Sequence, residues 1–304
     1  MGLGILCPGQ GGQHACMLEI VAGIAAAENA LDQATPLLGQ HPRDLLAGDP
    51  ARITRNAVAQ PLLCATQAAI WAGLQPLLPR PQAVAGYSIG ELSAYHVAGS
   101  LDISTLLELA GRRASLMDAA MAAAGALGAM LGVRGVSRQR LAQTGARIAI
   151  ANGPDRFVIG GRVAEIDALR EGLLTAGASL TDIAVDVASH TDLMLPAVAP
   201  FLAALQQVPM AAPAFPVMAG IDGSPVWRPD RGREVLAAQL TRTVEWAACL
   251  DGLLERGCTL LLELGPGDAL SRIARERYPD LPVRSVAEFQ SLPGVAAWVR
   301  RYLE

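Results

Sequence analysis

Short apolar runs alternate along the chain with longer stretches in which apolar residues recur at helical spacing. The mainly apolar runs at residues 4–7, 83–86 and 260–264 predict buried strands, and each is followed by a turn that contains glycine. Residues 57–78 have the spacing of a long helix, and another helix is predicted from Glu91. This alternation is typical of an α/β protein with a parallel sheet.

The middle of the chain has a different rhythm. Strands are predicted at 129–135, 147–151, 157–160 and 179–187, with helices at 137–144 and 163–176. The resulting order, βαββαβ, is the ferredoxin-like arrangement. We therefore expect a small ferredoxin-like α+β domain at residues 128–187, inserted into a large α/β domain that residues 1–127 and 188–304 form together.

Composition narrows the class of protein. With 304 residues, 52% of them hydrophobic and 17% charged, the chain can bury a large core and is not a disordered protein. The longest run without charged or strongly polar residues, 119–133, is shorter than the ~20 residues of a membrane span. The N-terminus lacks the pattern of a signal peptide, and a net charge of −4 argues against nucleic-acid binding.

Cysteine and lysine usage adds two facts. The five cysteines are odd in number and scattered, without a Cys-x-x-Cys pair, which favours reduced thiols over disulfides or a zinc site. We therefore expect a cytoplasmic protein. Lysine is absent, so all 24 basic residues are arginine, as a GC-rich coding bias would produce.

A candidate nucleophile lies in Gly86-Tyr87-Ser88-Ile89-Gly90, between a predicted strand and a predicted helix. In the Gly-x-Ser-x-Gly nucleophile elbow, a tight turn holds the serine hydroxyl clear of the backbone, and the flanking glycines avoid clashes. Amides at the start of the next helix also favour a developing oxyanion. Ordinary turns share the pattern, but its context favours catalysis by Ser88 in an α/β-hydrolase-like domain.

A serine nucleophile needs a base, and the chain has four histidines. His96 lies about 12 Å from Ser88 along the helix axis, by the ~1.5 Å rise per residue, and cannot easily reach back. His41 precedes a proline in a polar loop, where we expect it to be solvated. His14 follows a glycine-rich loop and is equally compatible with a place in the active site and with a place on the surface. His190, where the chain leaves the predicted small domain, is the base by elimination.

Two further segments are ambiguous from their residues alone. The loop Gln10-Gly11-Gly12-Gln13 exposes backbone amides but lacks the Lys-Ser/Thr ending of a phosphate loop. It supplies a second oxyanion donor only if it folds next to the serine. The pair Arg112-Arg113 lies on a predicted helix, and such a pair by default indicates the solvent-exposed face of the helix.

Five motifs, in order, resemble the malonyl-CoA:acyl carrier protein transacylase family, the acyltransferases of fatty-acid and polyketide synthesis. They are Pro8-Gly9-Gln10-Gly11-Gly12-Gln13, Gly86-Tyr87-Ser88-Ile89-Gly90-Glu91, Arg113 with Met117, Ser189-His190 with Leu193-Met194, and Glu263-Leu264-Gly265-Pro266-Gly267. The motifs span nearly the whole chain, and the family also has a small ferredoxin-like domain. The resemblance is therefore more specific than any single motif.

The resemblance implies roles in the chemistry. Ser88 corresponds to the nucleophile that becomes acylated, and His190 to its general base. In the family a backbone carbonyl, in place of a buried aspartate, orients the histidine. The matching stretch here is 243–246, so the carbonyl of Glu245 is the candidate.

The resemblance also implies how the substrate binds. The backbone amides of Gln10 and Ile89 correspond to the oxyanion hole. Arg113 corresponds to the arginine that grips the free carboxylate of a malonyl group, because a planar guanidinium can hold a carboxylate through two parallel hydrogen bonds. The implied substrates are malonyl-CoA and the phosphopantetheine-type thiol of an acyl carrier protein, with no metal and no permanently bound cofactor.

Two positions depart from the family pattern. Tyr87 stands where many members have histidine, and Ser189 where many have phenylalanine. Both flank the acyl pocket, so the exact acyl group stays open. The N-terminal segment 6–10 and the elbow Gly-Tyr-Ser-Ile-Gly together resemble the malonyl transferase (epsilon) subunit of malonate decarboxylase more closely than the housekeeping fatty-acid enzyme.

The sequence therefore predicts an acyltransferase that moves a malonyl group to an acyl carrier protein through Ser88, as the malonyl transferase of malonate decarboxylase, with other decarboxylase subunits as further partners. The alternatives are a transacylase of fatty-acid or polyketide synthesis, a serine thioesterase or esterase, and an inactive carrier-docking subunit. Arg113 favours transfer of a dicarboxylic acyl group over esterase activity. The pair Ser88 and His190 argues against an inactive subunit.

Overall fold

A six-stranded sheet forms the centre of the large domain in the computed structural model, which describes residues 2–303. Its strands run in the order β10-β9-β1-β2-β7-β8, and all neighbours are parallel except β7 and β8. The strands are β1 (Gly2–Cys7), β2 (Ala83–Gly86), β7 (Val217–Met218), β8 (Pro225–Val226), β9 (Cys258–Glu263) and β10 (Val283–Ser285). Because β1 is central and both of its faces are covered, every one of its residues is buried.

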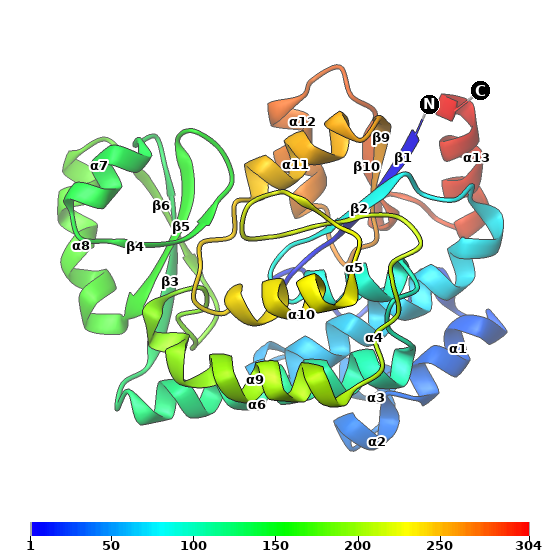
Figure 1. The fold of residues 1–304 in the computed structure, drawn as a ribbon, viewed down its shortest axis with the longest axis horizontal. Coiled ribbons are helices and arrows are strands. Elements are labelled where there is room, and N and C mark those ends of the chain that lie inside the picture. Colours follow the sequence, from blue (N-terminus) through cyan, green and yellow to red (C-terminus); the bar gives the residue numbers. More distant parts are fainter. Residues whose placement is uncertain (1, 304) are drawn as a thin grey trace.

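Helices cover both faces of this sheet (Figure 1). Leu3 and Ile5 of β1 face one core, which most helices share, whereas Leu6 faces the second core on the opposite side. The helices of the first face are α1 (Ala25–Asp32), α2 (Thr35–Leu38), α3 (Pro42–Ala47), α4 (Asn56–Leu74), α5 (Gly90–Val97), α6 (Ile103–Ala123), α9 (Leu195–Gln207), α10 (Pro229–Ala238) and α13 (Leu292–Leu303). Those of the second face are α11 (Trp246–Glu255) and α12 (Ala269–Arg277).

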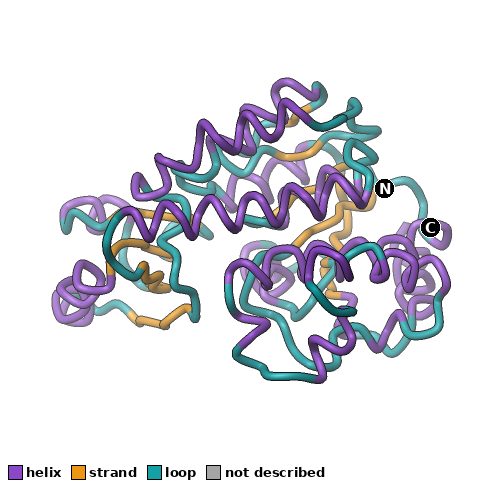
Figure 2. Tube along the Cα trace, turned by 90° about the horizontal axis from the view of Figure 1, so that it is seen from below, coloured by secondary structure: helices purple, strands orange, loops and turns teal. Residues whose placement is uncertain are grey.

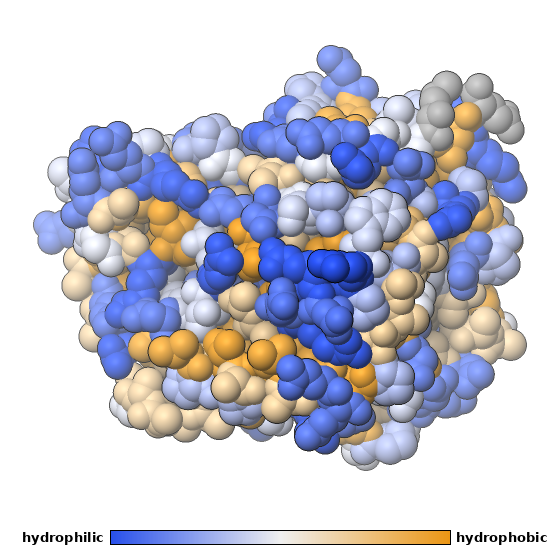
Figure 3. All heavy atoms as spheres, viewed as in Figure 1, coloured by the Kyte–Doolittle hydropathy of each residue, from blue (hydrophilic) through white to orange (hydrophobic). Residues whose placement is uncertain are grey.

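Five short 3-10 helices complete the regular structure: η1 (Glu19–Val21), η2 (Arg52–Thr54), η3 (Gln75–Leu77), η4 (Asp192–Met194) and η5 (Val286–Glu288). On the surface in the view of Figure 1, hydrophobic residues follow the outer side of α9, where Leu195 is 67% exposed. Figure 3 also shows that hydrophilic residues cover much of the rest of this face. The five cysteines are all free thiols.

The helix α4, continued by η3, is long and apolar enough to cross a membrane by length and composition alone. An 18-residue segment of this helix has a mean hydropathy of 1.3, and 83% of the segment is buried inside the protein. It packs between α1 and α6 beneath the central sheet (Figure 1). Its apolar surface is therefore covered by neighbouring helices, as in a core helix.

A second, four-stranded antiparallel sheet forms the small domain at one end of the molecule (Figures 1 and 2). Its strand order is β4-β5-β3-β6, and α7 (Arg138–Gln143) and α8 (Val163–Thr175) connect the strands in the order βαββαβ. The strands are β3 (Gly128–Arg134), β4 (Arg147–Ala151), β5 (Arg156–Arg162) and β6 (Ser179–Ile183). The predicted fold class, a parallel α/β domain with a ferredoxin-like insert, is confirmed.

The segment that precedes α11 joins the two sheets. Val244 pairs with Ile150 of β4 in a parallel bridge, and its carbonyl accepts a hydrogen bond from the Ala151 amide at 2.8 Å. The Thr243 hydroxyl donates to the carbonyl of Ile148 at 2.6 Å. The small domain is thus held against the large one by backbone pairing as well as by shared apolar core.

Candidate active site

Ser88 lies in the tight turn between β2 and α5. Its φ of 56° is in the left-handed region, which L-residues avoid unless the surroundings enforce it. A Cβ on Gly86 would lie 2.3 Å from the Glu91 amide nitrogen, and one on Gly90 would lie 2.1 Å from the Cys7 carbonyl oxygen. Only glycine fits at these two positions, so the strand, the turn and the helix can pack closely enough to form the elbow.

His190 is paired with this serine. Its Nε2 lies 2.8 Å from the Ser88 hydroxyl oxygen, and its Nδ1 lies 2.6 Å from the carbonyl oxygen of Gln239. Because a carbonyl can only accept, Nδ1 carries the hydrogen and Nε2 is left to accept the serine proton. Burial, reinforced by the positive charge of Arg113, lowers the pKa of His190 to about 3. The imidazole is therefore neutral and can act as a base.

The carbonyl that orients His190 belongs to Gln239, so the prediction of Glu245 is wrong. Gln239 follows the last turn of α10, where a carbonyl has no helical donor. The carbonyl of Glu245 already accepts from the Cys249 amide in the first turn of α11. The carboxylate of Glu245 forms a 2.6 Å ion pair with Arg138 of the small domain.

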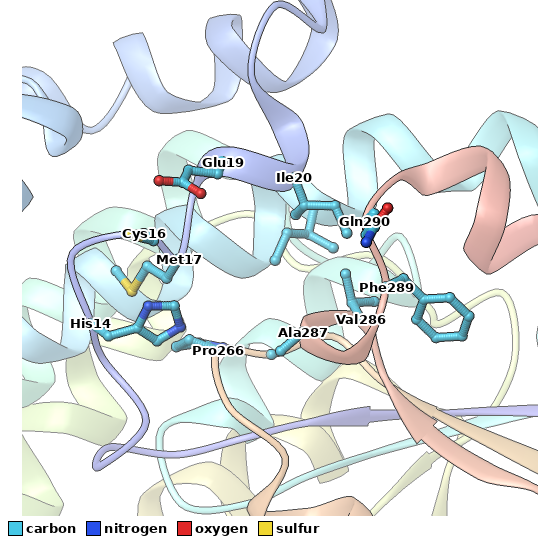
Figure 4. A pocket seen from close by; sticks show the side chains of 12 residues that line it. His14, Cys16, Met17, Glu19, Ile20, Pro266, Val286, Ala287, Phe289 and Gln290 are labelled. Atoms are coloured by element: carbon cyan, nitrogen blue, oxygen red, sulfur yellow. The ribbon is translucent and has the colours of Figure 1, made fainter.

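The other three histidines lie away from Ser88. His41 caps α3 by accepting from the Arg43 amide, and Nδ1 of His96 lies 2.9 Å from the carbonyl oxygen of Leu101. His14 is exposed and lines a separate cavity of about 430 Å³. Figure 4 shows this cavity between the segment around His14 and the segment around Phe289. The geometry thus agrees with the choice of base by elimination.

The two amides predicted for the oxyanion hole are both available. Neither the Gln10 nor the Ile89 amide donates a hydrogen bond to an acceptor in residues 2–303. Gln10 and Ser88 line the same cavity, and Ile89 directly follows the serine. A Cβ on Gly12 would lie 2.4 Å from the Pro266 carbonyl oxygen, so glycine is required where this loop passes between its neighbours.

Arg113 is buried, whereas its neighbour Arg112 is exposed and pairs with Glu108 at 3.0 Å. The Arg113 guanidinium donates to the side-chain oxygens of Gln60 at 2.8 Å and Gln239 at 3.2 Å. Burial lowers its pKa to about 10, which still leaves it charged near neutral pH. It forms no ion pair with a carboxylate in residues 2–303.

The cavity at Ser88 has a volume of about 630 Å³ and lies between the elbow, the Gln10 loop and the small domain. The small domain contributes an apolar wall, to which Met130, Ile150 and Val158 belong. Tyr87 and Ser189, the two departures from the family pattern, both line it. Arg113 is not among the lining residues and contacts the catalytic pair through Gln239.

The geometry adds three residues that sequence reasoning missed: Gln60, Glu91 as a functional side chain, and Gln239. Gln60 is a fully buried polar residue in the mostly apolar α4, which is a signal that the sequence contained, although Thr66 and Gln67 of the same helix share it. Gln239 carries no local motif, because its contribution to His190 is a main-chain carbonyl. Glu91 follows the elbow directly, and its carboxylate is fully buried.

Comparison with known proteins finds similarity over nearly the whole chain. The profile of the acyl transferase domain family matches residues 5–293. The malonyl CoA-acyl carrier protein transacylase of Mycobacterium tuberculosis is 31% identical, over 93% of this chain and 96% of that protein. The structure of the malonyl CoA-acyl carrier protein transacylase of Coxiella burnetii superposes with a TM-score of 0.92 at 25% identity, covering 100% of this chain and 98% of that one.

A third relative was solved as a complex. A malonyl-transacylase bound to its type II polyketide synthase acyl carrier protein superposes with a TM-score of 0.90 at 26% identity, covering 98% of this chain and 99% of that one. The similarity in all three cases extends over nearly the full length of both chains.

Proposed function

Because the chain belongs to the acyl transferase domain family, we propose that it transfers a malonyl group from malonyl-CoA to the thiol of an acyl carrier protein. One observation carries the proposal: the neutral imidazole of His190 lies 2.8 Å from the Ser88 hydroxyl oxygen. The family resemblance predicted both residues. Relatives that align over nearly their full length are named malonyl CoA-acyl carrier protein transacylases.

The reaction takes two acyl transfers. The Ser88 oxygen attacks the thioester carbonyl of malonyl-CoA, and His190 Nε2 takes the hydroxyl proton. The C–S bond then breaks, the proton passes from His190 to the CoA sulfur, and a malonyl ester remains on Ser88. The carrier thiol gives its proton to His190, attacks this ester and receives the malonyl group, and Ser88 regains its proton.

Two backbone amides stabilise the oxyanion of each tetrahedral intermediate. We assign this role to Gln10 and Ile89, because neither N–H group has an acceptor within residues 2–303, Gln10 lines the cavity at Ser88 and Ile89 directly follows the serine. A single donor of this kind contributes roughly 2.7–4 kcal/mol to transition-state stabilisation. Neither amide has to reorganise during the reaction.

We assign recognition of the malonyl carboxylate to Arg113. Its hydrogen-bond partners within residues 2–303 are two neutral amides, and no carboxylate there forms an ion pair with it, so an anionic substrate group would stabilise this buried cation. Arg113→Ala should therefore lower transfer of malonyl but retain transfer of acetyl, which has no free carboxylate. Acylation rates with the two CoA esters test this, with Arg112→Ala, the exposed neighbour, as the matched control. Unchanged malonyl transfer in Arg113→Ala would show that Arg113 does not bind the malonyl carboxylate.

The physiological acceptor is an acyl carrier protein, as the complex of a related malonyl-transacylase with its carrier supports. The cytoplasmic location predicted from the scattered cysteines stays a prediction. The named relatives favour a general malonyl transacylase over the malonate decarboxylase subunit. Assignment to malonate decarboxylase, with partner subunits, rests only on the sequence at residues 6–10 and 86–90 and stays a prediction.

Intact-mass measurement tests the proposal. The protein is mixed with malonyl-CoA, its mass is followed, and a carrier protein bearing the thiol is then added. We expect a malonyl adduct that persists, is absent in Ser88→Ala, and moves to the carrier. Rapid loss to free malonate without carrier indicates a thioesterase instead. No adduct under any condition overturns both enzymatic functions.

A further inference from the structure

Gln239 contacts the base, the buried cation and the nucleophile turn of the proposed site. Its main-chain carbonyl accepts from His190, and its side-chain oxygen accepts from Arg113. Its side-chain nitrogen donates to the main-chain carbonyl of Ser88 at 3.2 Å and to the carboxylate of Glu91. The base therefore depends on the main chain of this residue, whereas the cation and the nucleophile turn depend on how its side chain is oriented.

The orientation of that amide depends on Glu91. The carboxylate is fully buried, and it accepts from the Gln239 side chain through one oxygen and from the Gly220 amide, at 3.2 Å, through the other. A Cβ on Gly220 would lie only 2.5 Å from Glu91 Oε2 and 3.1 Å from the Gln239 side-chain nitrogen. The side chains of Glu91 and Gln239 are therefore packed against the backbone of Gly220 and have little room to rearrange.

We propose that Glu91 is a positioning residue, whose carboxylate fixes the Gln239 amide so that its oxygen faces Arg113 and its nitrogen faces the Ser88 turn. The inference deepens the proposed function and rests on it: Glu91 contacts no substrate and acts through Gln239. It links recognition of the acyl carboxylate by Arg113 to the elbow that bears the nucleophile.

The geometry requires an acceptor at both oxygens of residue 91. A glutamine there has one oxygen and one NH2 group, so one contact becomes a donor facing a donor. If its oxygen keeps the Gly220 amide, its nitrogen faces Gln239. The Gln239 amide must then turn over, which points NH2 at the guanidinium of Arg113 and an oxygen at the carbonyl of Ser88.

A similar arrangement holds the other side of Arg113. The Gln60 side-chain nitrogen donates to Asn56 at 2.6 Å, and the Asn56 nitrogen donates to the Asp118 carboxylate at 2.8 Å. These bonds turn the Gln60 oxygen toward Arg113. The guanidinium thus lies between two amide oxygens, and a chain of hydrogen bonds fixes each amide to a carboxylate.

Glu91→Gln tests the proposal, because it preserves side-chain shape and removes only the second acceptor. Acylation is measured with malonyl-CoA and with acetyl-CoA. We expect the malonyl-to-acetyl rate ratio to fall about tenfold, the equivalent of one hydrogen bond to a charged group. Glu263→Gln is the matched control: this carboxylate is also fully buried and accepts from two amides, those of Leu270 and Ser271, at 3.2 and 2.7 Å.

The control separates positioning from a general loss of stability, because Glu263 has no contact with Gln239 or Arg113. We expect Glu263→Gln to leave the malonyl-to-acetyl ratio unchanged while both variants lose thermal stability. A Glu91→Gln protein that loses malonyl and acetyl transfer in equal proportion overturns the proposal. Failure of the wild-type protein to form a malonyl adduct is a different result, because it overturns the proposed function itself.

A second variant covers the case in which Glu91→Gln does not fold. Gln239→Met keeps the main-chain carbonyl that holds His190 and removes the side-chain amide. The proposal predicts that malonyl transfer falls more than acetyl transfer here too, so the malonyl-to-acetyl ratio falls. An unchanged ratio in Gln239→Met overturns it regardless of how Glu91→Gln behaves.

Discussion

His190 is kept neutral by its surroundings at the pH where most enzymes work. His190 is almost fully buried, and Arg113, whose charge acts on it, is positive. Both effects disfavour the imidazolium and outweigh the hydrogen bond to the Gln239 carbonyl, which favours it, so the pKa falls to about 3. Glu91 shows the opposite effect of burial on an acid: its pKa is raised to about 7, although Arg113 lowers it in part and Asp222 raises it further.

These two pKa values predict different pH profiles for two acyl groups. Acetyl transfer needs only neutral His190, so its acylation rate should stay nearly constant between about pH 5 and pH 8. Malonyl transfer also needs ionised Glu91, which is present above its pKa of about 7 and is lost as the pH falls through it. Rapid-quench mass measurements of both reactions check this. A shared decline near pH 6.5 would show that His190 titrates as an ordinary histidine.

Residue identity predicted the site unevenly. Ser88 and His190 could be predicted because each role needs a particular side chain in a recognisable setting. The main-chain carbonyl that orients His190 could not, because every residue has one. The spacing from the family motif pointed to Glu245, but the end of α10 places the Gln239 carbonyl at the imidazole instead.

At the scale of elements, the elbow depends on how closely α5 approaches β1. Gly90 is the first residue of α5, and any Cβ there would meet the Cys7 carbonyl oxygen at the end of β1. Backbone atoms cannot move aside as a flexible side chain can. The glycine therefore sets the distance between helix and sheet, and through it the position of Ser88.

Gly90→Ala should destabilise the protein by about 3 kcal/mol and shift the elbow, because the overlap is with backbone. Gly172→Ala is the control, since Gly172 lies in α8 with nothing within 4 Å of the added Cβ. There the substitution should gain up to ~1 kcal/mol of helix stability. Thermal melts and adduct formation measure both effects. Equal stability of the two variants would contradict the close-approach argument.

The apolar pattern predicted some elements and not others. β4 was predicted with its observed bounds, and α8 to within one residue, because both have clear periodicity bounded by turns. The strands β7, β8 and β10 were not predicted. They are only two or three residues long, too short for any periodic signal, and exist because neighbouring strands supply their hydrogen bonds.

At the scale of the whole molecule, the site is assembled from distant parts of the chain. The loop at Gln10, the elbow at Ser88, the base at His190 and the end of α10 at Gln239 meet at one end of the sheet, beside the small domain. The start of β1 and the end of α13 lie close together at the other end of the molecule (Figures 1 and 2). The cavity is closed on one side by the small domain, so both domains are needed to enclose an acyl group.

The amino-acid sequence by itself predicted the fold class, the ferredoxin-like insert and the elbow serine, because each leaves a local pattern in the chain, and it predicted His190 by elimination among four histidines and by the family resemblance. Only the tertiary structure decided which carbonyl orients His190 and what surrounds Arg113. Arg112 and Arg113 are adjacent and chemically identical, but α6 directs one to solvent and the other into the interior. Burial, unpaired charge and hydrogen-bond geometry are properties of the folded surroundings, and no local pattern encodes them.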